Sequence, residues 1–383
     1  MVLTASQSDA REAVLTDMSA SLFASLSRAD QRRRGLAYLR GLLSVEGRKS
    51  ISNIASGLGP GAEQSLHHFV SNSTWCWNPM RDALACYVSE RFPPRAWVVR
   101  PTLIPKAGRN FVGVERHIHP ETGTAVNAQR AVGVWSTHES MSVPVHWRLH
   151  LPPAWLRDEE RRRQALIPDE AVEETMGDCV TAAVLARADR EGRRVPVVAD
   201  ARGQDAASMI RRLRARGLPV VVRIEGSMEV EPLVDRFPGP CPAHRLMAAA
   251  RHLRRVVPLR TAATGVSHQS PLVVAEVSVR LPSRRHRTSD MEGMLLLAVE
   301  DVAGSGPTEL WLADLAKSSV ADVVSLTRLM QQVDYGATIA DRLGIRDFSG
   351  RSFTGWHRHA TLVSAAHAVE ALAGTSPSMA RSA

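Results

Sequence analysis

The sequence predicts an α/β protein, in which a small helical domain precedes a mixed sheet that carries an inserted β-rich element. Residues 1 to about 92 show apolar side chains at helical spacing between Gly- and Pro-rich turns. From Ala96 onward the pattern changes to short apolar runs rich in β-branched residues. Residues 195–199, 205–216 and 219–224 read as strand, helix and strand, an order typical of a βαβ crossover.

Residues 1–94 form the predicted helical domain, which ends at Pro93-Pro94. Its apolar spacing predicts helices at 31–43, 50–58, 63–72 and 79–92. Gly59-Pro60-Gly61 separates the second of these from the third. That arrangement fits either a helix-turn-helix unit for DNA or an ordinary pair of packed helices, and both interpretations stay open here.

Residues 95–373 form the predicted sheet domain, with an insertion at about 226–306 that is rich in Pro, Gly and Arg and contains a basic turn at 284–287. Strands are expected at 97–99, 111–114, 131–135, 195–199, 219–224, 272–281, 294–302 and 310–315, and helices at 205–216, 320–343 and 357–373. Residues 374–383 are small and polar, which predicts a disordered tail.

The composition indicates a globular chain without a membrane segment or a disulfide framework. With 383 residues, of which 44% are hydrophobic, the chain is able to bury one large core or two smaller ones. No apolar run is long enough to span a bilayer, and the first residues lack the order of a signal peptide, so we expect a cytoplasmic protein. The four cysteines form no C-x-x-C pair, which favours free thiols over disulfides or a zinc site.

The charge balance favours nucleic acid as a partner. A net charge of +9 attracts acidic polymers, because each phosphate that is neutralised releases counterions. Nearly all of the positive charge is arginine, since the only lysines are Lys49, Lys106 and Lys317. Arginine is the better bidentate phosphate ligand, although a GC-rich genome would also favour its codons. We therefore expect nucleic acid as the partner.

A motif in the first expected strand is the most specific signal in the chain. The run Ala96-Trp-Val-Val-Arg100-Pro101-Thr102-Leu-Ile-Pro105-Lys106-Ala-Gly108-Arg109 resembles the first catalytic strand of bacterial insertion-sequence transposases with a DDE triad. In that family an apolar run ends in Asp-Asp-Thr and leads to Pro-Lys-x-Gly. The threonine and the Pro-Lys-x-Gly positions fit, whereas the two acidic positions hold Arg100 and Pro101.

Other blocks fit the same family in the same order, spread over most of residues 20–370. They include Tyr38-Leu-Arg-Gly41, His68-Phe69-Val70, Gly113-Val-Glu-Arg116, Trp147-Arg148-Leu149, Leu343-Gly344-Ile345 and Gly350-Arg351-Ser352-Phe353. Taken together, these blocks make the chain similar to the insertion sequence 701 group of transposases.

The resemblance implies a ribonuclease-H-like sheet whose three carboxylates hold two divalent metal ions for phosphodiester attack. The first acid falls at Arg100 or Pro101, neither of which binds a metal. The second falls at Asp200, which is also explicable as a loop or helix cap. The third falls at Asp334 or Val333. Asp200 and Asp334 are then the remnants of the triad, and we expect no metal cofactor.

The leading hypothesis is a transposase-derived protein that has lost catalysis but binds DNA, with a regulatory role and a homodimer left open. The residues expected to contact DNA are Arg32, Arg33, Arg34, Lys49, Lys106, Arg109, Arg116, Arg351 and Arg358.

Two alternatives stay open beside it. In the first, the chain is an active transposase with Mg²⁺ in a rebuilt acidic site. In the second, the vacated cleft binds a small molecule or a protein partner through an anion pocket. The acids named for the first are Glu115, Glu121 and Asp205, and the residues named for the second are Arg100, Lys106, Arg116 and Asp200.

Overall fold

The structure is a computed structural model that describes residues 5–118, 122–233, 239–258, 260–261, 268–269, 271–282, 293–301, 308–314 and 318–379. The basic turn expected at 284–287 and the candidate acid Glu121 lie outside these residues.

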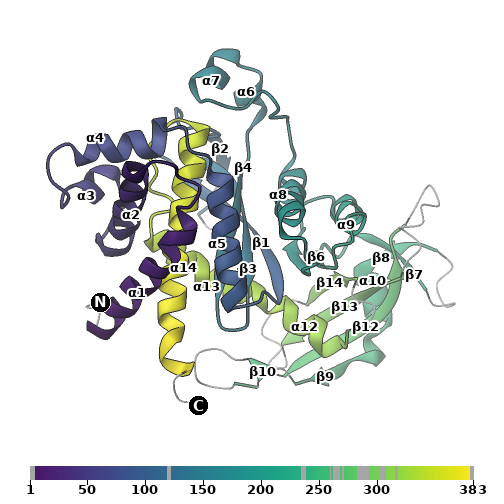
Figure 1. Cartoon of the computed structure of the whole chain (residues 1–383). Helices are drawn as coiled ribbons and strands as arrows, with labels where there is room; N and C mark the ends of the chain where they lie inside the picture. Colours follow the sequence, from purple (N-terminus) through teal and green to yellow (C-terminus); the bar gives the residue numbers. More distant parts are fainter. Residues whose placement is uncertain are drawn as a thin grey trace.

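A mixed sheet forms the centre of the described chain (Figure 1). Its strands are β1 (Ala96–Pro105), β2 (Glu115–Ile118), β3 (Ala125–Thr137), β4 (Ser142–Leu149), β5 (Val197–Asp200), β6 (Val220–Ile224), β7 (Glu229–Pro232), β8 (Cys241–Pro242), β9 (Arg255–Val257), β12 (Leu272–Arg280), β13 (Met294–Asp301) and β14 (Glu309–Ala313). Their order is β2-β3-β1-β5-β6-β14-β13-β12-β7-β8, with β4 beside β3 and β9 beside β12, and β10 (Arg260–Thr261) pairs separately with β11 (His268–Gln269). The predicted α/β fold with a mixed sheet is confirmed.

Helices cover both faces of this sheet. Before the sheet lie α1 (Ala5–Leu22), α2 (Ala29–Ser44), α3 (Ile51–Ala55), α4 (Ala62–His67), a π-helical turn (His68–Asn72) and α5 (Trp77–Arg91). Within the sheet domain lie α6 (Pro153–Leu156), α7 (Glu159–Gln164), α8 (Met176–Glu191), α9 (Ala206–Arg214), α10 (Ala243–Ala249), a 3-10 turn (Arg251–Leu253), α12 (Val320–Thr327), α13 (Leu329–Arg342) and α14 (Phe353–Met379). No helix of the described residues is long and apolar enough to cross a membrane.

The part of the sheet that carries Arg100 and Asp200 is built from β1 and its neighbours. β1 pairs antiparallel with β3 and parallel with β5, and β5 pairs parallel with β6. The βαβ crossover predicted at 195–224 is confirmed as β5, α9 and β6. Pro101 lies beyond the part of β1 that pairs with β5, where the strand has only one neighbour and tolerates a residue without an N–H group.

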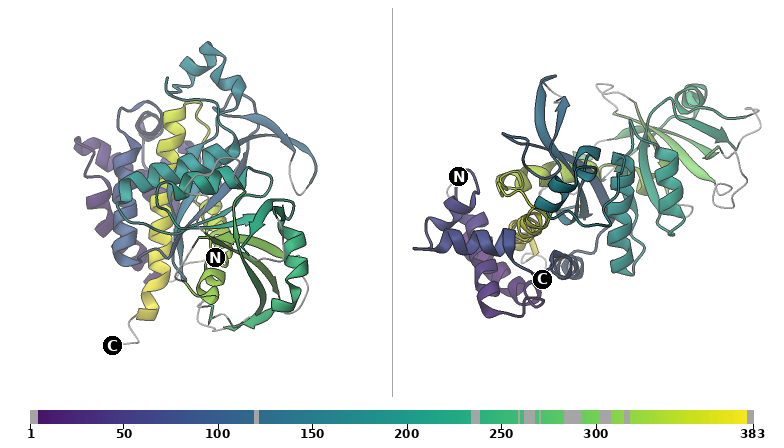
Figure 2. Two further views of the ribbon diagram at one scale, coloured as in Figure 1. Left: turned by 90° about the vertical axis from the view of Figure 1, so that its right-hand side faces the viewer. Right: turned by 90° about the horizontal axis from the view of Figure 1, so that it is seen from above.

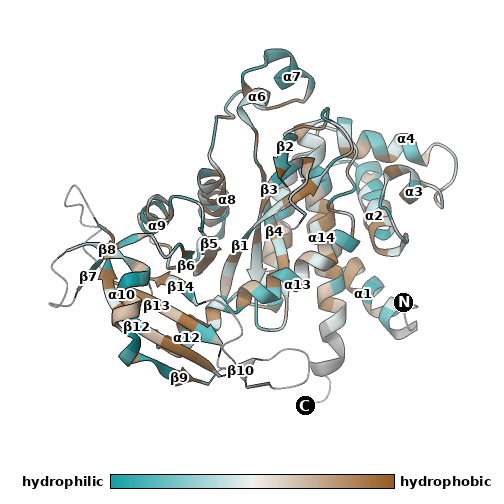
Figure 3. Cartoon of the chain, turned by 180° about the vertical axis from the view of Figure 1, so that it is seen from behind, coloured by the Kyte–Doolittle hydropathy of each residue, from teal (hydrophilic) through white to brown (hydrophobic). Residues whose placement is uncertain are grey.

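The two faces of the sheet have separate hydrophobic cores. One core joins the N-terminal helices, α12, α13 and α14 to the sheet, and includes Val98 and Val198. The other joins α8, α9 and α10 to the opposite face, and includes Val99 and Ala199. In Figure 2 the long α14, in yellow, runs between the N-terminal helices and the sheet. Figure 3 shows the contrast in hydropathy between the brown strands β12 and β13 and the teal, outlying α7.

The insertion at about 226–306 does not stand apart from the sheet. Its strands β12 and β13 continue the main sheet through β14, which pairs antiparallel with β6. Leu296 and Leu297 on β13 face opposite sides, and each is buried in a different core. The β-rich insertion is therefore an extension of the central sheet.

Two expected elements differ in the structure. Residues 111–114 form a turn, and β2 begins only at Glu115. The apolar run is buried there because Gly113 takes a left-handed backbone (φ 74°) against the carbonyl of His150, while Trp155 donates to the carbonyl of Val114. At the other end, α14 starts at Phe353 and includes residues 374–379, which the composition assigned to a disordered tail. Helices α1 and α8 and strand β4 were not specified from the sequence.

Candidate functional site

The first two predicted triad positions lie side by side at the carboxyl ends of β1 and β5. The parallel register pairs Val98 with Val198 and Val99 with Ala199, so Arg100 and Asp200 occupy the next place on each strand. Side chains alternate along a strand, and Val98 and Val198 belong to the core under α12, α13 and α14. Arg100 and Asp200 therefore face the side of the sheet on which α13 lies.

The side chain of Arg100 connects β1 to α13. Its Nε donates to Oδ1 of Asp334 over 3.0 Å. Val333, the other candidate for the third acid, is buried in the core, and Pro101 is exposed. Of the open alternatives, Arg100 and Asp334 are thus the two residues that reach the place between β1 and α13.

Asp200 is also held by arginines. Its carboxylate accepts hydrogen bonds from Nε and Nη2 of Arg202, the shortest at 2.6 Å, and from the Arg202 backbone N–H at 3.1 Å. The hydrogen bond to Asp200 raises the pKa of Arg202. Arg223, opposite Asp200 on β6, lies 3.8 Å from the same carboxylate and 3.1 Å from Glu309. Asp200 is consequently held in a network of alternating charges with Arg202, Arg223 and Glu309, whereas Asp334 pairs separately with Arg100.

These residues do not fit a pair of divalent metal ions. Mg²⁺ needs hard oxygen ligands in octahedral geometry, and both remaining carboxylates already accept hydrogen bonds from guanidinium groups. At an effective dielectric constant of about 20, a guanidinium about 4 Å from a divalent ion repels it by about 8 kcal/mol. The site therefore lacks both the ligand set and the charge that a DDE metal centre requires.

The acids named for a rebuilt site have other roles or positions. Asp205 caps α9 by accepting a hydrogen bond of 2.9 Å from the backbone N–H of Ser208. Glu115 on β2 lies 4.0 Å from Nε2 of His117. Among the residues that the structure describes, no group of three or more His, Cys, Asp or Glu side chains is arranged to hold a metal ion.

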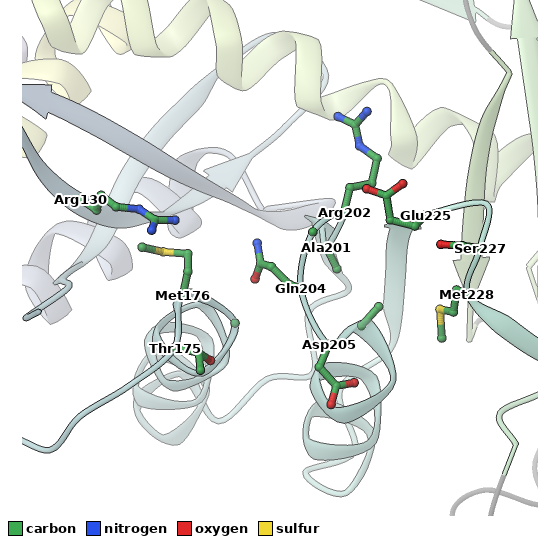
Figure 4. A pocket seen from close by; sticks show the side chains of 13 residues that line it. Arg130, Thr175, Met176, Ala201, Arg202, Gln204, Asp205, Glu225, Ser227 and Met228 are labelled. Atoms are coloured by element: carbon green, nitrogen blue, oxygen red, sulfur yellow. The ribbon is translucent and has the colours of Figure 1, made fainter. Parts of the chain in front are cut away.

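A cleft of about 680 Å³ opens near Asp200 at the ends of β5 and β6 (Figure 4). Arg130 from β3 lies on one side beside Met176, while Arg202 and Glu225 lie together on the other. Sequence reasoning named Asp205 and Asp200 but not this cleft, because its walls come from distant segments. Its lining mixes both signs of charge, so it gives no defined anion or cation site.

Three of the cations expected to contact DNA support the fold, and of these Lys49 and Arg358 are buried and Lys106 is half-buried. Lys106 donates to the backbone carbonyls of Arg346 and Phe348 at 2.9 and 2.8 Å, and burial lowers its pKa to about 8. Arg358 donates to the carbonyls of Trp75, Val70 and Ser71. Lys49 is 5% exposed, and burial lowers its pKa as well. Burial removes Lys49 and Arg358 from the surface that a duplex would contact, and the ammonium group of the half-buried Lys106 is engaged by backbone carbonyls.

The other six expected DNA contacts are at the surface. Arg32 donates to the carbonyl of Leu26, and Arg34 forms an ion pair with Asp30 at 3.0 Å. The remaining four are exposed, and their side chains form no hydrogen bond or ion pair with any described residue. They are Arg33, Arg109, Arg116 and Arg351, which together are called the free arginine set.

The free arginine set comes from several parts of the fold. Arg33 is on α2 and Arg116 is on β2. Arg109 follows β1, in the loop that Lys106 fastens to residues 346–348, and Arg351 follows those residues. Arg109 and Arg351 are thus on neighbouring loops, whereas Arg33 belongs to the helical domain.

Comparison with known families gives one match. A family model described as DDE superfamily endonuclease matches residues 21–289, which is well over half of the chain and includes both Arg100 and Asp200. A search of curated proteins finds no significant match. The mixed sheet and its helices agree with the ribonuclease-H-like fold of that family.

Proposed function

The chain belongs to the DDE superfamily endonucleases, and from this premise we propose that it is a catalytically inactive, transposase-derived protein that binds double-stranded DNA. The proposal includes descent from transposases of the insertion sequence 701 type and a regulatory role in the cytoplasm. Binding without cleavage is the activity that such a protein retains when its scaffold is kept and its metal ligands are replaced.

One observation carries the loss of catalysis. The guanidinium of Arg100 occupies the first acid position of β1 and binds Asp334, the candidate third acid, over 3.0 Å. Asp200, the second, is bound by Arg202. Each acid therefore has an internal counter-ion, and the centre is stabilised without a metal.

Charge supports the retained binding to DNA. The net charge of +9 gives a sequence-independent attraction to phosphates. The free arginine set supplies guanidinium groups that no described carboxylate neutralises. Arginines of this kind are suited to bidentate phosphate contacts.

The test combines a cleavage assay with a binding assay on the same purified protein. With Mg²⁺ or Mn²⁺, we expect no nicking or joining of duplex DNA, including DNA that carries terminal repeats. In mobility-shift titrations we expect affinity to fall steeply with salt. Metal-dependent nicking would support the active transposase instead, and failure to bind duplex at low salt would support a reused cleft.

A matched pair of variants separates the free arginine set from net charge. One variant replaces all four residues of the set by alanine. The control replaces four exposed arginines that form ion pairs with nearby acids, namely Arg157, Arg161, Arg163 and Arg346. We expect the first variant to reduce the salt slope by about 0.9 for each phosphate that is no longer neutralised, and the control to keep the wild-type slope. Equal slopes in the two variants would contradict a role for the free arginine set.

A further inference from the structure

A small cavity of about 260 Å³ lies where the N-terminal helices meet the sheet domain, away from Arg100 and Asp200. Its walls come from the start of α5, from β4, from α8 with the segment before it, and from the start of α14; Arg190 of α8, which forms an ion pair with Asp82, is among the lining residues. The aromatic and basic side chains that line it include Trp77, Arg81, His146, Arg148, Phe353 and His357.

Arg81 brings an unneutralised positive charge to the wall of this cavity. The residue is 2% exposed, and burial lowers its pKa to about 9, so that it stays charged at neutral pH. Its hydrogen bonds go to neutral acceptors: the hydroxyl of Thr361, the carbonyl of Trp147 and His357. Among the described residues no carboxylate pairs with it. A buried cation without a counter-ion is costly, and an anion in the cavity would offset that cost.

His146 supplies a second polar group that has no partner. It is 8% exposed, and neither of its ring nitrogens has a hydrogen-bond partner among the described residues. Burial and the charges of Arg81 and Arg148 lower its pKa well below the ordinary value, so its imidazole is neutral. A neutral imidazole has one N–H to donate, and the ring nitrogens of His146 are not among the fully buried polar atoms without a partner, so an unpaired N–H here is open to the cavity.

The other walls restrict the size and charge of an occupant. Trp77 stacks on His357 with ring centroids 4.9 Å apart, and Phe353 meets the same imidazole edge-on. These rings provide an apolar, flat surface. Arg148 is already neutralised by Glu174 through two hydrogen bonds of 2.8 and 2.9 Å. Glu170, which is exposed and also lines the cavity, disfavours an occupant with more than one negative charge.

We propose that this cavity is a binding site for a small monocarboxylate with a planar apolar body, held by Arg81 and His146. The carboxylate lies against the guanidinium and the imidazole N–H, and the apolar body lies against Trp77 and Phe353. A volume of 260 Å³ is several times the roughly 30 Å³ occupied by one water molecule, which limits the ligand to about ten non-hydrogen atoms. The site is independent of DNA binding and of the vacated metal centre.

The test uses benzoate as the probe and benzamide as its uncharged isostere. Calorimetric titration and thermal unfolding of the full chain are expected to show saturable binding of benzoate at millimolar or lower concentration, and a higher melting temperature. Benzamide and inorganic phosphate are expected to produce neither effect. No saturable binding of benzoate, or equal effects of benzamide or phosphate, would overturn the proposal.

Variants locate the site within the cavity. Arg81→Met is expected to abolish benzoate binding, and His146→Leu to weaken it by about tenfold or more, which is about 1.4 kcal/mol. Arg163→Ala, an exposed arginine on α7 paired with Glu160, serves as the control and is expected to bind as the wild type does. If Arg81→Met does not fold, His146→Leu decides the question alone, and unchanged affinity in that folded variant would contradict the assignment.

Discussion

Arg100 on β1 and Asp334 on α13 are 234 positions apart in the chain and are joined by a hydrogen bond of 3.0 Å from Nε to Oδ1. In the proposed assignment, the pair stands where a DDE metal centre needs two of its acids. Together with the ion pair between Arg202 and Asp200 it gives the site an internal charge balance. The carboxylates are therefore neutralised by side chains of the same protein.

The Arg100–Asp334 pair is expected to contribute little to stability. The two side chains are 33% and 65% exposed, and ion pairs in such positions are worth about 0–1 kcal/mol. A double-mutant cycle of Arg100→Ala and Asp334→Ala, measured by urea unfolding, is therefore expected to give a coupling free energy below about 1 kcal/mol. A coupling of about 3 kcal/mol would mean that the pair is a structural requirement of the fold rather than a substitution at a former catalytic site.

Arg358 and Arg351 are expected to behave differently although they are close in sequence. Arg358→Ala leaves buried backbone carbonyls without a donor, so we expect a loss of about 3 kcal/mol or more in the free energy of unfolding. Arg351→Ala removes an exposed side chain and is expected to change stability by less than about 0.5 kcal/mol. Because Arg351 is a proposed DNA contact and Arg358 is not on the surface, Arg351→Ala is expected to weaken DNA binding while the protein stays folded. Similar stability of the two variants would contradict the structural role of Arg358.

Two buried histidines make stability depend on pH. Burial lowers the pKa of His359 and of His367 to about 4 from an ordinary value of 6.5. Neutral His359 donates through Nε2 to the carbonyl of Gly344 and accepts at Nδ1 from Tyr38. Because each folded-state pKa lies below the unfolded value, this stability is present above pH 6.5 and is lost as pH falls toward 4.

The loss is expected to reach about 3 kcal/mol for each histidine once the pH is below 4. Urea unfolding at a series of pH values measures it. In His359→Gln the free energy of unfolding is expected to fall by about 3 kcal/mol less between pH 6.5 and 4 than in the wild type, because only one of the two histidines remains. A stability that is constant across this range in the wild type would show that these histidines are not buried in neutral form.

The strands that position the site were predictable because their local patterns are strong. The apolar runs ending at Arg100 and Asp200, and the crossover to β6, correspond to strands of the structure. The strand predicted at 111–114 was wrong, because a buried turn and a buried strand have the same apolar composition. Gly113 was the local sign of the turn.

The site itself was only partly predictable. The resemblance to the transposase family located Arg100 and Asp200, but it left Pro101 and Val333 as alternatives. Which way a strand or helix residue faces depends on neighbours that are distant in the sequence. For the same reason, nothing in the local sequence separates the half-buried Lys106 from the exposed Arg109. The cavity beside Arg81 joins segments from four parts of the chain and has no local signature.

The most direct measurement is a calorimetric titration of the wild-type protein with Mn²⁺ at neutral pH and low salt. The guanidinium of Arg100 occupies the first acid position, so we predict no saturable binding of metal at this site. Tight binding of two ions per chain that is abolished in Asp200→Asn and Asp334→Asn would contradict the account, because it would show that these carboxylates still form a metal centre despite the arginine.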